Sequence, residues 1–346
     1  MFTHPFGSAV TSVRRGWRVL ATVVALSCAV LSATAQEAPP LIRVTILGSG
    51  SPVPSSTRFS QSTLVEAGGQ RLLFDLGRGV TIRLAQLGIP FRDITASFIT
   101  HFHSDHLVGL PDLWLTGWLP TPWASRTQPF VIYGPVGTTE MTGHLSKAFA
   151  RDESIREADE LLPKAGIAFD AHDIGPGLVY DQSGLTVTAF EAHHGDLITP
   201  NYGYTIAYRG KKVVISSDTT YDERVARQAA GADLLLHEVA DIDPGLLKAF
   251  PRFKEIAAHH TSPEEAGRIF SLAKPKLAAF THIIVAKAKA PLDVPPTEVL
   301  ARTRSTYEGP LVLGEDLMRF DIGDDVTVWN ARHQPVQAHA DPQAKP

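Results

Sequence analysis

The segment His101-Phe102-His103-Ser104-Asp105-His106 constrains this chain more than any other feature. Three imidazoles and one carboxylate follow directly on the apolar stretch 96–100. In an extended segment His101 and His103 point to the same side, because side chains alternate along a strand. Asp105 shares that register, and a turn here would direct His106 toward a second ion. Nitrogen and oxygen ligands of this kind suit zinc, with manganese and iron as alternatives, so the segment predicts a metal site.

Four later segments supply further ligands, each next to a predicted strand or helix. They are His193 and His194 after 185–191, Asp218 within 216–220, His259 and His260 before the Pro263 helix, and His282 after 277–281. Polar residues at strand ends, held by a rigid sheet, are a common way to build an active site. Each histidine alone also fits an ordinary core or surface residue, and the metal interpretation comes from their combination and order.

Strand-like and helical segments alternate along the rest of the chain. The predicted strands are 41–47, 63–67, 70–74, 96–100, 130–133, 185–191, 202–208, 212–217, 234–237, 277–281, 318–322 and 326–329. The predicted helices are 79–87, 107–119, a charged helix or arm at 151–162, and one that opens at Pro263 with Thr261 or Ser262 as its cap. This mixture predicts one α/β domain in which two sheets lie between helices.

The first 35 residues have the pattern of a secretory signal peptide. Arg14, Arg15 and Arg18 precede an apolar run from Val19 to Leu31, and Ala33-Thr34-Ala35 is a small-residue cleavage site. The apolar run is short for a membrane span. We therefore expect a periplasmic or secreted protein with no stable membrane span after cleavage, by either the Sec or the twin-arginine route. Residues 36–346 are expected to form one hydrolase domain with a frayed tail from Ala331.

Cleavage after Ala35 would remove three arginines, no acidic residue, and Cys28, the only cysteine. The mature chain would then have neither a disulfide nor a thiolate ligand. It would also be more acidic than the full chain, whose formal net charge is −4. Because nucleic-acid binding depends on clustered Lys and Arg, this charge balance disfavours nucleic acid as a partner.

The order of these motifs resembles the metallo-β-lactamase superfamily, and most closely its branch of ribonuclease Z and exported arylsulfatase-like hydrolases. Besides the H-x-H-x-D-H segment, the resemblance rests on Leu47-Gly48-Ser49-Gly50-Ser51-Pro52, Phe74-Asp75-Leu76-Gly77-Arg78-Gly79, Ser217-Asp218-Thr219 and His260-Thr261-Ser262-Pro263-Glu264. It extends from about Val44 to Ile322. It implies an αββα four-layer sandwich, with two mixed sheets flanked by helices, and a site for two zinc ions.

The resemblance also implies a role for each candidate residue. The first ion would be held by His101, His103 and His194, the second by Asp105, His106 and His282, with Asp218 bridging them. His194 is preferred over His193 because it precedes Gly195, and His193 is then a neighbour of the ligands. Asp75 would support the ligands from beneath. His260 resembles the proton donor of this branch, with Glu238 orienting it, and Asp105 would also take a proton from water.

Trp114 and Trp118 lie four residues apart on the predicted helix 107–119 and share one face. They would either wall a pocket for an apolar leaving group, or pack in the core or against a second subunit. The two interpretations have equal support from the sequence.

Two zinc ions about 3.5–4 Å apart lower the pKa of a shared water toward about 7, which suits ester hydrolysis. The expected function is therefore an exported, arylsulfatase-like zinc hydrolase of small-molecule esters, with a homodimer as an open question. Phosphodiesterase or ribonuclease Z-type tRNA 3′-endonuclease activity is the main alternative, although 141–180 lacks a Gly/Pro-rich basic arm. Two further alternatives are a lactonase or β-lactamase-like hydrolase and a non-enzymatic periplasmic metal-binding protein.

Overall fold

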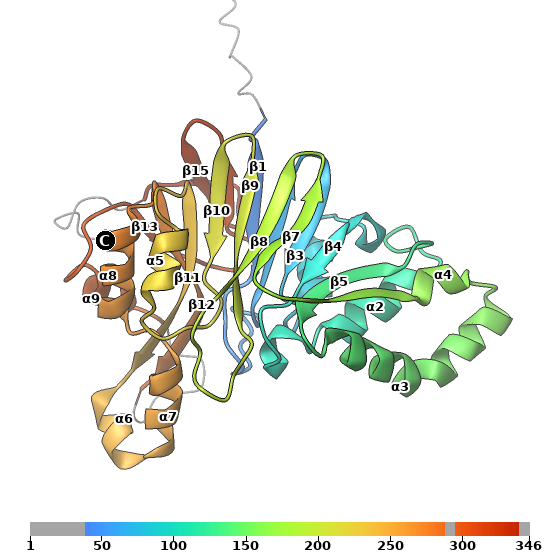
Figure 1. Cartoon of the computed structure of the whole chain (residues 1–346), viewed down its shortest axis with the longest axis horizontal. Helices are drawn as coiled ribbons and strands as arrows, with labels where there is room; N and C mark the ends of the chain where they lie inside the picture. Colours follow the sequence, from blue (N-terminus) through green and yellow to red (C-terminus); the bar gives the residue numbers. More distant parts are fainter. Residues whose placement is uncertain (1–38, 288–294, 339–346) are drawn as a thin grey trace, which may run out of the picture. The chain divides into compact units, whose positions relative to one another are not determined.

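The protein was analysed as a computed structural model that describes residues 39–287 and 295–338. The predicted signal peptide lies outside the described residues. Within them, strands assemble into two mixed sheets (Figure 1). The nine-stranded sheet has the order β16-β15-β14-β1-β2-β3-β4-β5-β6, and the seven-stranded sheet has the order β13-β12-β11-β10-β9-β8-β7.

The first sheet combines strands from both ends of the described chain. Its members are β1 (Ile42–Gly48), β2 (Ser62–Ala67), β3 (Gln70–Phe74), β4 (Ala96–Phe98), β5 (Phe130–Pro135), β6 (Phe169–Ile174), β14 (Arg319–Ile322), β15 (Val326–Trp329) and β16 (Pro335–Val336). β3 to β6 run parallel, whereas the β1, β2, β14, β15 and β16 pairings are antiparallel. The predicted hairpins at 63–74 and 318–329 are both present.

The second sheet changes from antiparallel to parallel pairing at β10. Its members are β7 (Gly177–Gln182), β8 (Leu185–Glu191), β9 (Tyr202–Tyr208), β10 (Lys211–Ile215), β11 (Leu234–Ile242), β12 (Leu277–Ala286) and β13 (Leu311–Leu313). β7 to β10 pair antiparallel, and β10 to β13 pair parallel. The parallel part places the end of β10 beside the middle of β11 and β12, where Asp218, Glu238 and His282 lie.

Helices cover the outer face of each sheet. They are α1 (Val80–Gln86), α2 (Leu110–Trp118), α3 (Thr138–Asp159), α4 (Lys164–Ile167), α5 (Glu223–Gln228), α6 (Pro244–Ala249), α7 (Arg252–His259), α8 (Pro263–Ala273) and α9 (Val299–Thr303). One buried cluster, with Phe74 and Ile215 as members, lies between the sheets. Two others pack α1 and α2 on the first sheet and α5 and α8 on the second. This arrangement confirms the predicted four-layer fold.

The start of α8 follows from its sequence. Ser262 is the N-cap, its hydroxyl accepts from the backbone N–H of Glu265, and the Glu265 carboxylate accepts from the Ser262 backbone N–H. This capping box satisfies free backbone donors at the helix terminus, and Pro263 favours the first helical position. The predicted helix is therefore confirmed, with Ser262 rather than Thr261 as its cap.

Other segments differ from the sequence prediction. β11 continues to Ile242 and β12 to Ala286, five residues beyond each predicted end, and α6 and α7 form an unpredicted helical lobe beside them (Figure 1). The charged segment 151–162 belongs mostly to α3, which starts at Thr138. The tail from Ala331 contains β16, which pairs with β15. No helix among the described residues is long and apolar enough to cross a bilayer.

Candidate metal centre

The predicted ligands come from loops and strand ends of both sheets. His101, His103, Asp105 and His106 follow β4, His194 follows β8, and Asp218 follows β10. His282 lies inside β12, so the expectation that it ends a strand is wrong. At this point Glu238 of β11 faces two residues of β12, Thr281 and His282, and His282 has φ of 42°. Such a bulge redirects a side chain while the strand continues.

The first group of candidate ligands consists of the three histidines His101, His103 and His194, together with Asp218. The Nδ1 atom of His103 lies 2.9 Å from His101 Nε2 and 3.2 Å from His194 Nε2. Ligand atoms of these residues and Asp218 all lie within 4.8 Å of one another. Three imidazole nitrogens that converge this closely fit the donor set of a zinc ion.

The second group consists of Asp105, His106 and His282, whose ligand atoms also lie within 4.8 Å of one another. The Asp105 carboxylate is 3.0 Å from His282 Nε2. The Nε2 atom of His106 is buried and has no hydrogen-bond partner among the described residues. Because a buried polar atom is normally paired, this nitrogen fits a metal ligand better than a structural residue.

Asp218 lies between the two groups. One of its carboxylate oxygens is 3.3 Å from His282 Nε2, 3.4 Å from His106 Nε2 and 3.7 Å from His194 Nε2. A carboxylate in this position can contribute to both groups, as the sequence interpretation requires.

Residues behind the ligands fix their orientation. Asp75 accepts from His106 Nδ1 at 2.8 Å and from the Thr100 backbone N–H at 2.9 Å. The carbonyl of His259 accepts from His194 Nδ1 at 2.8 Å. Each contact assigns the proton to Nδ1 and leaves Nε2 as the acceptor that faces the site. Asp75 therefore occupies the supporting position that was predicted for it.

Asn201 is a supporting residue that the sequence analysis missed. Its side-chain amide donates to the carbonyls of Ala192 and Asp218, both at 2.9 Å, and accepts from the Ser217 hydroxyl at 2.6 Å. These bonds join the loop of His194 to the loop of Asp218. The available signal was a polar residue directly before the strand 202–208, which is weak evidence without knowledge of its burial.

Burial and charge prepare the groups for metal binding. Burial lowers the pKa of His101 well below its usual value, and burial also lowers the pKa of His194 to about 4. Both imidazoles are therefore neutral at pH 7, which is the metal-binding form. For Asp218, burial favours the neutral acid, but His282 and His106 outweigh it and hold the pKa well below its usual value. The carboxylate is consequently ionised.

His260 and Glu238 form a pair beside the ligands. His260 Nδ1 is 3.3 Å from a Glu238 carboxylate oxygen, whose partner oxygen accepts from the Thr261 backbone N–H at 2.7 Å. Burial alone would lower the pKa of His260, but the adjacent Glu238 outweighs it and raises the pKa to about 9. The imidazole is then protonated at pH 7 and available as a proton donor.

Three other predicted residues lie away from the ligand groups. His193 has a half-exposed side chain near Asp196, and it contacts the loop that follows Asp218 through its backbone, whose carbonyl accepts from Thr219 and Thr220 and whose N–H donates to Asp222. Trp114 and Trp118 are buried in the core and donate to the carbonyls of Ile167 and Pro163. The two indoles therefore pack in the core, and the expectation that they wall a pocket for an apolar leaving group is wrong.

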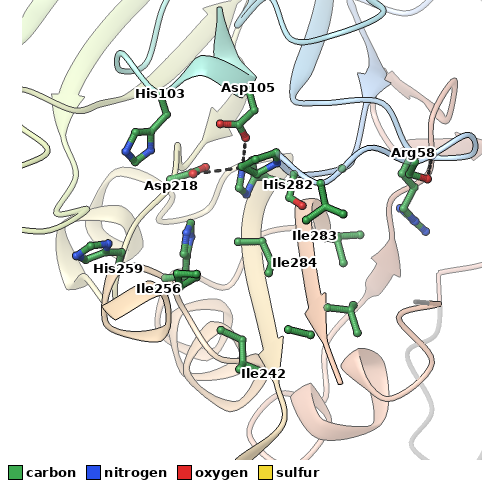
Figure 2. A pocket seen from close by; sticks show the side chains of 18 of the residues that line it. Arg58, His103, Asp105, Asp218, Ile242, Ile256, His259, His282, Ile283 and Ile284 are labelled. Atoms are coloured by element: carbon green, nitrogen blue, oxygen red, sulfur yellow. Dashed lines mark hydrogen bonds and ion pairs between the residues drawn. The ribbon is translucent and has the colours of Figure 1, made fainter. Parts of the chain in front are cut away.

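A cavity of about 470 Å³ opens at the two ligand groups. Candidate ligands and the proton donor lie along its wall: His103, Asp105, Asp218, His260 and His282. Figure 2 shows the side chains of Asp105, Asp218 and His282 directed toward one another at one end of this cavity. A substrate in the cavity would therefore reach both the metal groups and the His260–Glu238 pair.

Comparison with known proteins identifies the family. The family model described as Anti-Pycsar protein Apyc1 matches residues 42–246. Ribonuclease Z of Mycobacterium sp. (strain KMS) is 34% identical over 290 residues, which cover 83% of this chain and 99% of that protein. The chain belongs to the ribonuclease Z family. This ribonuclease Z-family chain is thus a metal-dependent hydrolase of the metallo-β-lactamase fold.

Solved structures agree on the fold. The metallo-beta-lactamase fold protein YhfI from Bacillus subtilis has a TM-score of 0.60 and 19% identity, and the match covers 80% of this chain and 98% of YhfI. The short form of human tRNase Z has a TM-score of 0.59 and 24% identity, with 81% and 99% covered. These likenesses confirm the fold of the ribonuclease Z-family chain.

The family assignment overturns two expectations. The arylsulfatase-like function is wrong, because the relatives that match nearly end to end are named ribonuclease Z. The expectation of a small-molecule ester partner and no nucleic acid is wrong for the same reason. The physical error was to use the net charge of the whole chain as evidence about one site. The lactonase or β-lactamase alternative and the homodimer stay predictions.

Proposed function

We propose that this chain is a two-metal phosphodiesterase of the ribonuclease Z type that cleaves the 3′ region of an RNA. The observation that carries the proposal is the convergence of two ligand groups and a protonated histidine on one cavity. The end-to-end similarity to proteins named ribonuclease Z supports RNA as the substrate class.

The proposed cofactors are two zinc ions per chain. His101, His103 and His194 would hold one ion, Asp105, His106 and His282 the other, and Asp218 would contact both. When bound, such ions supply an activated water and stabilise the negative charge that develops on the phosphoryl oxygens. The imidazole-rich donor set favours zinc over magnesium or calcium, which prefer oxygen ligands.

The side chains of the protein divide the proton transfers between them. His260, protonated and held by Glu238, donates to the oxygen that leaves the phosphorus. Asp105 lines the same cavity, and its carboxylate is ionised, because His106 and His282 overcome the opposing effect of burial and lower its pKa. It is therefore able to accept a proton from the attacking water. Asp75 and Asn201 keep the ligands in place during this exchange.

The test uses residues 36–346 loaded with zinc. We expect cleavage of a precursor tRNA that carries a 3′ extension, loss of cleavage with a chelator, and recovery when zinc is restored. Bis(p-nitrophenyl) phosphate serves as a second substrate, because any two-metal phosphodiesterase should act on it. Cleavage of this ester with no cleavage of RNA would refute the RNA substrate only. A zinc-loaded protein inert on both would refute the whole proposal.

Export remains part of the proposal and rests on the sequence alone. Arg14, Arg15 and Arg18 before the apolar run 19–31, with a cleavage site at Ala35, support it. Fractionation of cells that express the full chain, with N-terminal sequencing of the product, tests it. A mature N-terminus at Gln36 outside the cytoplasm is expected, whereas an intact cytoplasmic chain would contradict export. An exported enzyme would meet RNA released outside the cytoplasm.

A further inference from the structure

One side of the cavity is apolar, and the two-metal chemistry gives this surface no role. The cavity is lined by Ile242, Phe253, Ile256, Ile283 and Ile284. We call these five residues the apolar wall. Figure 2 shows its four isoleucines below the ligand groups. Ile256 is 40% exposed, although isoleucine is usually buried. An exposed apolar surface inside a reactive cavity indicates a binding surface for an apolar part of the substrate.

The bulge at Glu238 and His282 explains why this wall adjoins the metal groups. Before the bulge, β11 and β12 belong to the core, and after it they continue as paired strands from Val239 to Ile242 and from Ile283 to Ala286. The wall residues Ile283 and Ile284 therefore follow directly on His282, and Ile242 lies four residues beyond Glu238 on the neighbouring strand. Their position relative to the metal groups is fixed by backbone hydrogen bonds.

Packing against the helical lobe holds part of the wall in place. Ile242, Phe253 and Ile284 belong to one apolar cluster with Leu246 of α6 and Ala257 of α7. The lobe thus supports the strand extensions from one side and contributes Phe253 and Ile256 to the cavity. A surface that is already formed binds a ligand without the cost of ordering side chains.

The wall carries little charge to hold a second phosphate. Among the described residues that line the cavity, Arg58 is the one arginine and there is no lysine. Its guanidinium donates to the Ser49 hydroxyl at 2.8 Å and to the Gly314 carbonyl at 2.6 Å, and Figure 2 shows it at the side of the cavity. Beyond the ligand groups, the cavity therefore favours an uncharged, apolar group over another phosphate.

We propose that the apolar wall binds a planar ring attached to the scissile phosphate, on the side of the leaving oxygen. His260 marks this side, because the proton donor must lie next to the leaving oxygen and it borders the same cavity. The inference rests on the proposed phosphodiesterase function and specifies its substrate. A nucleobase of an RNA and a simple aryl group share this chemistry, so the experiment must distinguish them.

The experiment measures equilibrium binding to the zinc-loaded protein by calorimetry and needs no turnover. The probes are methyl phosphate, phenyl phosphate and adenosine 3′-monophosphate, which share a phosphate and differ in the attached group. Burial of a ring against the wall predicts that phenyl phosphate binds about tenfold more tightly than methyl phosphate. Failure of the proposed function would appear as absent cleavage, while this binding preference would still be measurable.

Two variants test whether the wall causes the preference. Ile256→Ser removes an exposed apolar contact, and Phe253→Leu removes a ring while keeping an apolar side chain in the lobe. Both are expected to reduce the preference to within about threefold. Ile155→Ser is the matched control, because Ile155 is also an exposed helical isoleucine, 48% exposed on α3, and does not line the cavity. The control should keep the full preference.

The outcomes separate the possibilities. The proposal would be supported, with a nucleobase as the ring, if adenosine 3′-monophosphate also binds more tightly than methyl phosphate and loses this preference in both variants. A preference confined to phenyl phosphate would support it with an aryl group and would count against RNA. Equal affinity for methyl and phenyl phosphate, or a preference that survives Ile256→Ser, would overturn the proposal.

Discussion

Glu238→Gln isolates the effect of one charge on the proton donor. His260 and Glu238 are both buried, with side chains 9% and 1% exposed, and the carboxylate raises the His260 pKa from 6.5 to about 9. At about 1.4 kcal/mol per pKa unit, this corresponds to roughly 3 kcal/mol in favour of the protonated imidazole. Glutamine keeps an oxygen that accepts from the Thr261 backbone N–H, so the substitution removes charge and little else.

The sign of the effect follows from the role of His260 as donor. Activity needs the protonated form, so it is lost as pH rises through the His260 pKa of about 9. Glu238→Gln removes the two largest contributions that raise the pKa of His260, whereas burial still lowers it, so the pKa of the imidazole falls. We expect kcat at pH 8 to fall at least about tenfold and to recover as the pH is lowered toward 6.

The assay is the pH profile of kcat for bis(p-nitrophenyl) phosphate, with metal content measured for each sample. Glu66→Gln is the control, since Glu66 also pairs with a cation, Arg71, but lies on β2 away from the cavity. It should leave the profile unchanged. Identical profiles for Glu238→Gln and the unaltered protein, with equal metal content, would refute the assignment of His260 as a donor controlled by Glu238.

Four further outcomes are expected. Asp218→Ala should lose bound zinc and activity together, as measured by metal analysis and turnover, whereas His260→Ala should keep zinc and lose about 10²–10⁴-fold in rate. Asp316→Asn should lower the free energy of unfolding by about 3–5 kcal/mol in urea titrations, because it removes the charge that pairs with the largely buried Arg83 and weakens the anchor of Ser49. Chelation should lower Tm, because it removes the free energy with which bound zinc stabilises the folded state. This free energy is about 2.7 kcal/mol for one site when the free zinc concentration is a hundred times Kd.

The ligand set could be predicted from sequence because its signal is local. Three histidines and an aspartate stand within six residues at 101–106, and the partners His194, Asp218 and His282 each follow an apolar run. In the structure these side chains converge into two groups. Strand periodicity and side-chain chemistry pointed to the candidate residues, and the family resemblance supplied the choice of His194 over His193 and the division into two groups.

The cavity could not be predicted, because it depends on pairing between distant segments. The run 277–281 is followed by a histidine, so the strand was expected to end there, although the bulge lets β12 continue to Ala286. A bulge depends on which residues of β11 and β12 face each other, and one sequence does not contain that register. The lobe of α6 and α7 was missed for a related reason. Its apolar residues pack on the strand extension, which was itself unpredicted.

The charge argument failed because it averaged over the whole chain. A net charge of −4 describes the full sequence, whereas a substrate phosphate experiences the field of the cavity. Two bound zinc ions would contribute four positive charges there, against two negative charges from the carboxylates of Asp105 and Asp218, while the charge of protonated His260 is balanced by Glu238. The cavity is therefore cationic when loaded, without any cluster of lysines. An acidic chain of this family is consequently compatible with an RNA substrate, provided that metal ions and not basic side chains hold the scissile phosphate.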